Sequence, residues 1–165
     1  MINFSFYSSP VGQILIAERD KKLLGVWIEE NPNLLSKYGD NILEQESEII
    51  TKTKLWLNNY FAGKNPSVTK FEYDLIGTEF QKLVWKFLRD IPYGQTTTYK
   101  QIAKKVANAL GKNKMSSQAV GGAVGKNPIS IIIPCHRVIG TNGKMIGYAS
   151  GVDKKISLLK LEGVL

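Results

Sequence analysis

The spacing of apolar residues changes along the chain, and this change limits the possible folds most strongly. Apolar and polar side chains alternate loosely over residues 2–7, as expected for a strand with one buried face. Residues 13–17 and 23–28 are apolar stretches joined by a charged tip, which predicts an antiparallel hairpin. Residues 41–61 carry apolar side chains at near-helical spacing, and the Gly-Lys-Asn-Pro sequence at 63–66 predicts the end of that helix. The first third is therefore expected to form a small antiparallel sheet with one helix.

Two capping boxes predict where helices begin in the second half. Thr78 is followed three residues later by Gln81, and Thr98 by Gln101, a spacing at which side chain and backbone bond each other at a helix start. An apolar stripe at helical spacing follows each box. A third helix is predicted to begin near Ser116, after a short polar turn. Two short helices joined by a turn indicate a helix-turn-helix.

Together these patterns predict an α/β (α+β) chain with two domains. Residues 1–70 are predicted to form an N-terminal α/β domain, residues 71–76 an extended linker, and residues 77–165 a mainly helical C-terminal domain. A length of 165 residues allows one domain or two small ones.

The chain has one cysteine, Cys135, and one histidine, His136. It can therefore form no intrachain disulfide and no structural zinc site of Cys and His ligands. No apolar run is long enough to span a bilayer, and the first residues lack the basic and apolar regions of a signal peptide. We expect a cytoplasmic protein without metal or cofactor, and a monomer, because no segment indicates a stable oligomer.

The net charge of +8 is spread unevenly along the chain. Residues 1–76 hold 8 basic and 10 acidic residues, whereas residues 77–165 hold 14 basic and 4 acidic ones. Residues 91–152 contain no Asp or Glu and eight Lys and Arg residues. A lysine cluster is most often a solvated helix face. Because this acid-free stretch overlaps the predicted helix-turn-helix, it favours nucleic acid as the partner.

The predicted third helix, over residues 116–125, is rich in glycine. Each glycine inside a helix costs roughly 1 kcal/mol relative to alanine, so their presence needs a reason. One explanation is tight packing against another helix, or a stretch that is not helical, and composition alone favours this. The other explanation is that small residues let the backbone approach a bulky partner such as nucleic acid.

Cys135 lies between an apolar run ending in proline and the dipeptide His136-Arg137. A lone cysteine is usually a small buried hydrophobic residue. Proline favours a bend here, and a neighbouring His and Arg lower the pKa of a thiol and favour the nucleophilic thiolate. Adjacent side chains on a strand point to opposite faces, so contact between Cys135 and His136 needs a turn or a bridging water. These residues alone leave both a reactive and a structural cysteine open.

Around Cys135 the sequence resembles the active-site signature of the O6-alkylguanine-DNA alkyltransferase (methylated-DNA–protein-cysteine methyltransferase) family. The resemblance keeps order and spacing over residues 77–165, whereas residues 1–70 resemble the family in layout only. It rests on residues 77–81, 91–94, 98–103, 119–123, 127–128, 133–138, 147–149 and 161–163. The resemblance implies a ribonuclease H-like N-terminal domain and a winged-helix-like C-terminal domain that carries the helix-turn-helix.

The resemblance also implies a single-turnover DNA repair enzyme. Such proteins bind double-stranded DNA containing O6-alkylguanine, turn the damaged base out of the helix and move its alkyl group, such as methyl, irreversibly to the cysteine. Cys135 would be the nucleophile and His136 the general base, acting through a water molecule. Glu162 would orient His136 and stabilise its charge. Asn127 would support the active-site turn, and O4-alkylthymine is left open as a second substrate.

A base pocket and a DNA-binding surface follow from the same resemblance. Tyr99 would donate a hydrogen bond to the extruded guanine, and the backbone of Cys135 and Val138 would contact the edge of the base. Tyr148 and the amide of Ala149 would close the pocket near O6. The second helix of the motif would enter the minor groove. The DNA-binding residues would be Ser116, Ser117, Gln118, Ala119, Gly121, Gly122 and Arg137.

The sequence departs from the family pattern in three places. Gln118 stands where the family usually has an arginine that fills the gap left by the extruded base, which bears on the efficiency of extrusion. The turn at residues 108–114 is a few residues longer than usual, and its lysines can add phosphate contacts. Ala149 lacks a hydroxyl that some members have at this position, so only its backbone amide is left to contact the base near O6. Zinc, which some members hold in the N-terminal domain, has no Cys or His ligands there.

Two other functions explain parts of the sequence. A non-catalytic module that binds alkylated bases would share the DNA-binding features, but such relatives lack the cysteine. A thiol hydrolase would use Cys135 and His136, but it would explain neither the acid-free stretch nor the glycine-rich helix. The sequence therefore favours alkyl transfer, with the non-catalytic module as the alternative.

Overall fold

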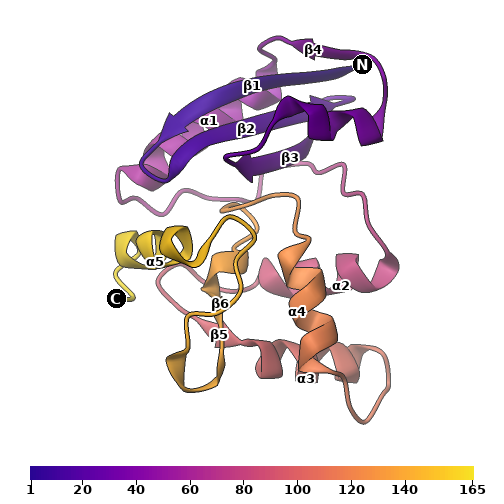
Figure 1. Cartoon of the computed structure of the whole chain (residues 1–165), viewed down its shortest axis with the longest axis vertical. Coiled ribbons are helices and arrows are strands. Elements are labelled where there is room, and N and C mark those ends of the chain that lie inside the picture. The colour runs from indigo at the N-terminus through magenta and orange to yellow at the C-terminus, as the bar shows by residue number, and fades with distance from the viewer. The chain divides into compact units, whose positions relative to one another are not determined.

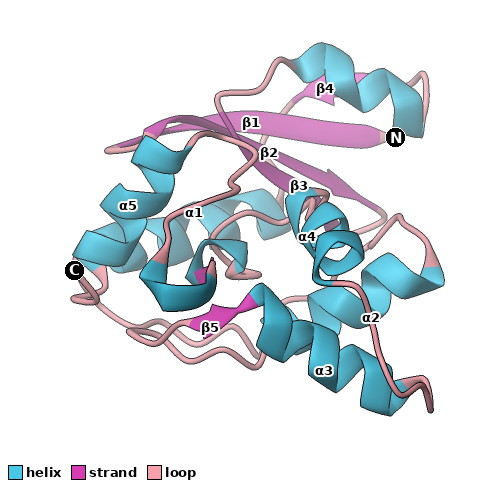
Figure 2. Cartoon of the chain, turned by 60° about the horizontal axis from the view of Figure 1, so that its bottom comes forward, coloured by secondary structure: helices cyan, strands magenta, loops and turns pink.

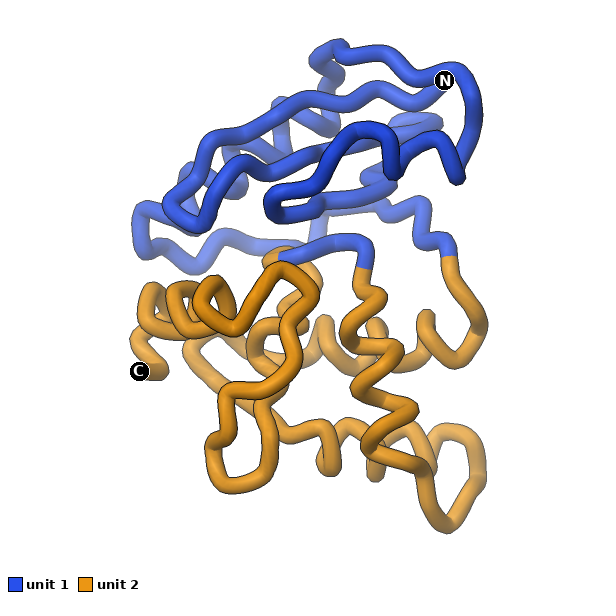
Figure 3. The backbone as a smooth tube through the Cα atoms, viewed as in Figure 1, with its two compact units in different colours: residues 1–76, 128–130 blue, residues 77–127, 131–165 orange.

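The computed structural model describes residues 1–165. The chain divides into two compact units, shown in different colours in Figure 3. Unit 1 comprises residues 1–76 and 128–130, and unit 2 comprises residues 77–127 and 131–165. None of the helices has the length and the hydropathy that crossing a bilayer requires.

Unit 1 is built on a four-stranded sheet of order β3-β2-β1-β4, with a helix against one face (Figure 1). The strands β1 (Ile2–Ser9), β2 (Gly12–Arg19) and β3 (Lys22–Ile28) are antiparallel neighbours, which confirms the predicted strand and hairpin. Asp20 and Lys21 form the hairpin turn with φ of 52° and 63°. Positive φ at both turn residues matches the twist of the flanking strands, so the turn is shorter than the charged tip in the sequence suggests.

The segment predicted as one helix over residues 41–61 contains a strand and a helix. The strand β4 (Ile42–Glu44) pairs in parallel with β1, so the sheet is mixed and not purely antiparallel. The helix α1 (Glu48–Phe61) begins later because the Ser47 side chain caps it, accepting a hydrogen bond from the amide of Ile50. The predicted helix start was wrong because two adjacent apolar residues fit a short strand as well as a helix.

The sheet of unit 1 is covered on both faces. The four central residues of β2, 14–17, are all fully buried, as expected for a strand without a solvent face. The 3-10 helix η1 (Pro32–Tyr38), which the sequence did not predict, buries Leu35 against one face. The helix α1 packs against β1 and β2. A core cluster in this unit consists of Ile2, Phe4, Leu15, Ala17, Leu24 and Leu35.

Two segments distant in sequence cover the outer edge of β3. The backbone bonds run from Leu23 N to Glu72 O, Asp74 N to Leu23 O, Val26 N to Pro128 O and Ser130 N to Val26 O, all at 2.9 Å. Covering a strand edge in this way satisfies backbone groups that would otherwise attract another chain. Two residues of the predicted linker, Glu72 and Asp74, are therefore bonded to the sheet of unit 1. The division into domains 1–70 and 77–165 with a linker between them stays a prediction.

Unit 2 is mainly helical (Figure 2). Its helices are α2 (Glu79–Leu88), α3 (Tyr99–Ala109), α4 (Ser117–Gly125) and α5 (Val152–Leu161). Both predicted capping boxes are present, at the starts of α2 and α3. The helices α3 and α4 pack against each other and against α2, which confirms the helix-turn-helix. The sequence did not predict α5, because Gly151 precedes it and no side chain caps it.

A short parallel strand pair connects the helix-turn-helix to the cysteine segment. The strand β5 (Thr97–Thr98) directly precedes α3, and β6 (Val138–Ile139) directly follows the 3-10 turn η2 (Cys135–Arg137). Pairing of β5 with β6 therefore places the first residue of α3 near the cysteine turn. A further 3-10 turn, η3 (Thr141–Gly143), follows β6.

Candidate active site

The cysteine lies in a buried bend of unit 2. Pro134 precedes the turn η2 with φ −82° and ψ 65°, so the chain bends at the proline. The Asn127 side chain donates a hydrogen bond to the carbonyl of Ile133 at 2.8 Å, which ties the end of α4 to the run before the cysteine. Ile131 has φ of 72°, a conformation that costs energy for a β-branched residue and occurs mainly where the surroundings enforce it. These contacts fix the run that leads into the cysteine turn, and the amide of Cys135 bonds the same Ile133 carbonyl at 2.8 Å.

His136 is fully buried and bonded to Glu162, with Nε2 2.6 Å from Oε2. An ionised carboxylate can only accept a hydrogen bond, so Nε2 carries the proton and Nδ1 keeps its lone pair. Nδ1 is buried and has no hydrogen-bond partner in the chain, so it does not bond Cys135 directly. Burial lowers the pKa of His136, while the hydrogen bond and charge of Glu162 raise it. The net lowering favours a neutral ring that can accept a proton at Nδ1.

Glu162 is the centre of a buried polar network at the end of α5. Besides His136, its carboxylate accepts hydrogen bonds from Arg137 Nε at 2.8 Å, from Arg137 Nη2 at 3.1 Å and from the amide of Gly94 at 3.1 Å. A buried charge is tolerated only when hydrogen bonds satisfy it in this way. The network therefore fixes the position of the His136 ring.

Arg137, predicted on the DNA-binding surface, lies in the interior instead. Only 8% of the residue is exposed, and its third donor, Nη1, bonds the carbonyl of Ile91 at 2.8 Å. The 3-10 turn directs both Arg137 and His136 toward Glu162, which no spacing rule in the sequence shows. Arg137 thus neutralises a buried carboxylate.

Sequence reasoning missed Lys155, which lies fully buried in α5. Its ammonium group donates hydrogen bonds to the carbonyls of Val138, Ile146 at 2.9 Å and Gly147 at 3.0 Å, and it forms no ion pair with a carboxylate. Burial lowers the pKa of Lys155 to about 8, and the nearby Cys135 raises it. No local pattern marks a lysine of this kind, because its carbonyl partners lie outside the helix.

The pKa of the Cys135 thiol reflects two opposed effects. Burial raises it, whereas a hydrogen bond from the Asn127 side chain and the charge of Lys155 lower it. The sequence predicts that His136 and Arg137 lower the pKa of Cys135, but the guanidinium group of Arg137 is hydrogen-bonded to Glu162. Because burial is the larger effect, the thiol keeps its proton at rest and ionises only when a base removes that proton.

Two of the residues predicted to hold the base, Tyr99 and Tyr148, lie near Cys135. The Tyr99 hydroxyl lies 3.1 Å from the carbonyl of Ile146 and 3.2 Å from that of Gly147, so in this conformation it contacts the loop before Tyr148. The Tyr148 hydroxyl is buried without a hydrogen-bond partner in the chain. Burial, then the charge of Cys135, raises the pKa of both tyrosines, which places them near the thiol.

The two remaining base-pocket residues differ in exposure. Val138 is buried in β6, and its carbonyl is already bonded to Lys155. Ala149 is exposed. The backbone of Val138 could therefore contact a base through its amide, whereas its carbonyl would first have to break the hydrogen bond to Lys155.

The glycine-rich helix α4 presents an exposed face of small residues. Ser116, which caps the helix, is exposed, and the exposed or half-exposed residues of the helix include Ser117, Gln118, Ala119, Gly121 and Gly122. A Cβ atom on Gly122 or Gly125 would meet no atom within 4 Å, and one on Gly121 would lie 3.7 Å from the Tyr99 ring, an ordinary contact. The segment is helical, and packing within the chain does not require these glycines. Both structural explanations for the glycines are therefore excluded for Gly122 and Gly125.

A groove of about 470 Å³ opens beside this face, between the starts of α3 and α4 and the loop after β6. We call it the α3–α4 groove. Lys100 is the one charged residue that lines it, and no acidic residue does. Its lining consists of Tyr99, Lys100, Ser117, Gln118, Gly121, Gly140, Thr141, Ile146 and Gly147.

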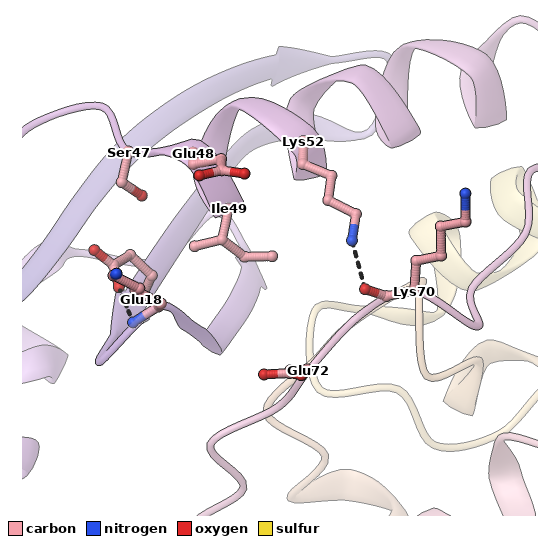
Figure 4. Close-up of a pocket in the computed structure, with 8 residues that line it drawn as sticks. Glu18, Ser47, Glu48, Ile49, Lys52, Lys70 and Glu72 are labelled. Carbon is pink, nitrogen blue, oxygen red and sulfur yellow. Dashed lines mark hydrogen bonds between the residues drawn. The ribbon is translucent and has the colours of Figure 1, made fainter.

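Unit 1 contains a pocket of similar volume, about 470 Å³, but of different character (Figure 4). Its lining consists of Glu18, Lys21, Ser47, Glu48, Ile49, Lys52, Lys70 and Glu72. Acidic and basic residues balance, and Lys52 points to the backbone carbonyl of Lys70 and bonds it. This pocket has no net charge with which to attract an anion. No group of His, Cys, Asp and Glu side chains in the chain could hold a metal ion.

The fold and site define a chain with a helix-turn-helix and a buried cysteine next to a histidine–carboxylate pair. Known families match both parts of it. The family model described as "6-O-methylguanine DNA methyltransferase, DNA binding domain" matches residues 79–164. The model described as "6-O-methylguanine DNA methyltransferase, ribonuclease-like domain" matches residues 2–75.

Relatives and solved structures agree with these matches. A methylated-DNA–protein-cysteine methyltransferase of Methanosarcina acetivorans is 45% identical over 162 residues, 97% of each chain. One of Mycolicibacterium paratuberculosis is 40% identical over 98% of this chain and 93% of its own. The crystal structure of the Mycobacterium tuberculosis O6-methylguanine methyltransferase superposes with a TM-score of 0.82 at 36% identity, covering 98% and 93% of the two chains. The chain therefore belongs to the 6-O-methylguanine DNA methyltransferase family, as the resemblance in its sequence indicated.

Proposed function

We propose that this protein repairs O6-alkylated guanine in duplex DNA by moving the alkyl group irreversibly to Cys135. The observation that carries the proposal is the arrangement of Cys135 next to a neutral His136 whose ring Glu162 holds at 2.6 Å. A thiol that burial keeps protonated needs a base, and a base needs a group that fixes its orientation. All three are present in one buried site.

The reaction follows from these positions. His136 Nδ1 accepts the thiol proton through a bridging water, and Glu162 stabilises the imidazolium that forms. The thiolate sulfur of Cys135 attacks the alkyl carbon, a C–S bond forms, and the bond between that carbon and O6 breaks with its electrons passing to the guanine. The guanine takes up a proton, which balances the one that the thiol gave up, so the leaving group is the neutral base and stays attached to its deoxyribose. The thioether is stable, so each chain reacts once.

Lys155 and Asn127 support this chemistry in the proposed mechanism. Both lower the pKa of Cys135 and so oppose the effect of its burial. Lys155 also holds the carbonyls of Ile146 and Gly147, just before Tyr148, and thereby fixes one side of the base pocket. The buried, unpaired hydroxyl of Tyr148 can donate a hydrogen bond to a bound base.

The DNA partner is supported by the exposed face of α4 and by the lysines of residues 91–152. Small side chains on α4 allow its backbone to approach a minor groove closely. Extrusion of a base costs a few kcal/mol of unstacking, which contacts in a pocket offset. A relative of known structure, the Mycobacterium tuberculosis OGT "in complex with DNA", has a TM-score of 0.81 at 36% identity, covering 97% and 92% of the two chains. O6-alkylguanine as the substrate, a monomeric state and a cytoplasmic location belong to this proposal.

Analysis of the DNA product tests the proposal. The protein is incubated with a duplex that contains one O6-methylguanine, and the nucleosides of the DNA are then measured. We expect unmodified guanine to appear in an amount equal to the protein added, with the strand intact and no free base released. A released base would indicate excision, and an unchanged duplex that still binds would indicate the non-catalytic module.

A further inference from the structure

Lys100 stands out in the α3–α4 groove because it is the one charged side chain among nine lining residues. It lies in the first turn of α3, is exposed, and forms no ion pair. Since no carboxylate lines the groove, nothing there competes with an anionic ligand for this ammonium group. Neither the α3 nor the α4 first turn contains an acidic residue, which leaves the partial positive charge of both helix starts uncompensated.

The rest of the lining fits a nucleotide of a DNA strand. Ser117, Thr141 and Gln118 offer hydroxyl and amide donors for phosphate oxygens. Tyr99 and Ile146 offer an apolar wall for a deoxyribose, and glycines allow its close approach. A volume of about 470 Å³ is within the range of pockets for molecules of nucleotide size. The groove therefore matches a phosphodiester with its sugar in charge, hydrogen bonding and size.

Gln118 lines the same groove and carries no charge. We propose that Lys100 binds the phosphate next to the extruded nucleotide in the α3–α4 groove and supplies the positive charge that Gln118 does not. The inference rests on the proposed function and adds to it a residue that favours duplex DNA over the free base. Lys100 contacts the DNA backbone and takes no part in the transfer step.

The test compares Lys100→Gln with Lys86→Gln, a matched control. Lys86 lies in α2, is also exposed, does not line the groove, and lies outside the acid-free stretch of residues 91–152. Single-turnover transfer rates are measured with a duplex containing O6-methylguanine and with free O6-benzylguanine, whose benzylic carbon reacts readily with a thiolate. We expect the ratio of the duplex rate to the free-base rate to fall roughly tenfold in Lys100→Gln, as for loss of a charge-assisted hydrogen bond. In Lys86→Gln this ratio should fall by less than about threefold.

A second experiment tests whether Lys100 supplies the positive charge that Gln118 does not. Lys100→Gln is combined with Gln118→Arg, which brings a charge into the groove from α4. We expect the effect of Lys100→Gln on the ratio to shrink to less than about threefold in this background, because contacts to a shared partner are not additive. An effect of equal size in both backgrounds would show that Lys100 does not compensate for Gln118.

The outcomes separate this inference from the proposed function. If the unmodified protein reacts with neither substrate, the proposed function fails, and the inference fails with it. If it reacts with both and Lys100→Gln leaves the ratio as it was, or lowers it no more than Lys86→Gln does, the inference alone is overturned. Thermal unfolding of each variant checks that these exposed substitutions leave the fold intact.

Discussion

Around Cys135, individual side chains have effects that their neighbours in sequence do not reveal. His136 and Arg137 follow the cysteine directly, yet both contact Glu162, 26 and 25 positions later. The sequence could predict that a histidine and a carboxylate serve the cysteine, because the motif carries them. It could not predict the direction of Arg137 or the burial of Lys155, since both depend on a 3-10 turn and on carbonyls from other segments.

The position of Arg137 predicts a loss of stability when it is replaced. In Arg137→Gln, Glu162 keeps its charge in the interior but loses two guanidinium donors. We expect the free energy of unfolding in urea to fall by about 3 kcal/mol, as for other broken buried ion pairs. The salt dependence of DNA binding should match that of the unmodified protein. Normal stability with a weaker salt dependence would instead place Arg137 on the DNA.

The buried Lys155 predicts a dependence of stability on pH. Its pKa is lowered from 10.5 to about 8 in the folded chain, so between these values the unfolded chain binds more protons. Stability of the unmodified protein relative to Lys155→Met should therefore rise with pH in this window, by about 1.4 kcal/mol per pH unit. Urea unfolding of both proteins at three pH values between 8 and 10 measures how this difference in the free energy of unfolding changes with pH. A difference that does not change with pH would contradict the burial of a titrating Lys155.

Among the elements, those with local start signals were predictable and those with distant partners were not. The capping boxes of α2 and α3 lie within four residues, so the sequence contains all that defines them. The strand β4 exists because it pairs with β1, about forty residues earlier, and its three residues carry too little pattern of their own. For α4 the sequence predicted a helix but left two explanations for its glycines open. The open space beside Gly122 and Gly125 shows that packing within the chain does not require glycine at these two positions.

This open space predicts opposite effects of one substitution on stability and on binding. Gly122→Ala adds a methyl group that meets no atom within 4 Å, and it should raise the free energy of unfolding by about 0.4–1 kcal/mol. Because Gly122 lies on the predicted DNA face, the same methyl group should weaken binding to duplex DNA. Gly125→Ala, at the last residue of α4, is the matched control that should stabilise the helix with a smaller effect on binding. Equal DNA affinity of Gly122→Ala and the unmodified protein would remove this face from the interface.

In the molecule as a whole, charge is divided between the two halves of the chain. The net charge of +8 comes from residues 77–165, because residues 1–76 hold more acidic than basic residues. This division could be seen in the sequence, since it needs only counting. The contribution of residues 128–130 to the edge of β3 could not, because a three-residue strand partner has no recognisable pattern.

The charge division predicts that position matters more than net charge for DNA binding. One triple variant replaces Lys104, Lys105 and Lys112 of unit 2 by Gln. Its control replaces Lys21, Lys22 and Lys37 of unit 1, with the same loss of three charges.

We expect the first variant to bind duplex DNA more weakly and to lose up to about 0.9 of log–log salt slope per lysine that contacts phosphate. The control should keep the slope of the unmodified protein. DNA affinity measured by fluorescence anisotropy over a range of salt concentrations shows whether the position of the lysines or the net charge governs binding. Equal losses in both variants would show that net charge alone governs binding.

The mass of the intact chain after reaction with methylated DNA tests the central claim most directly. The protein is mixed with a duplex that contains O6-methylguanine, and its mass is compared with that of a Cys135→Ser variant treated in the same way. We predict a gain of one methyl group, located at Cys135 by peptide mapping and absent from the variant. An unchanged mass in the presence of bound DNA, or a methyl group on the Cys135→Ser variant, would contradict transfer to Cys135.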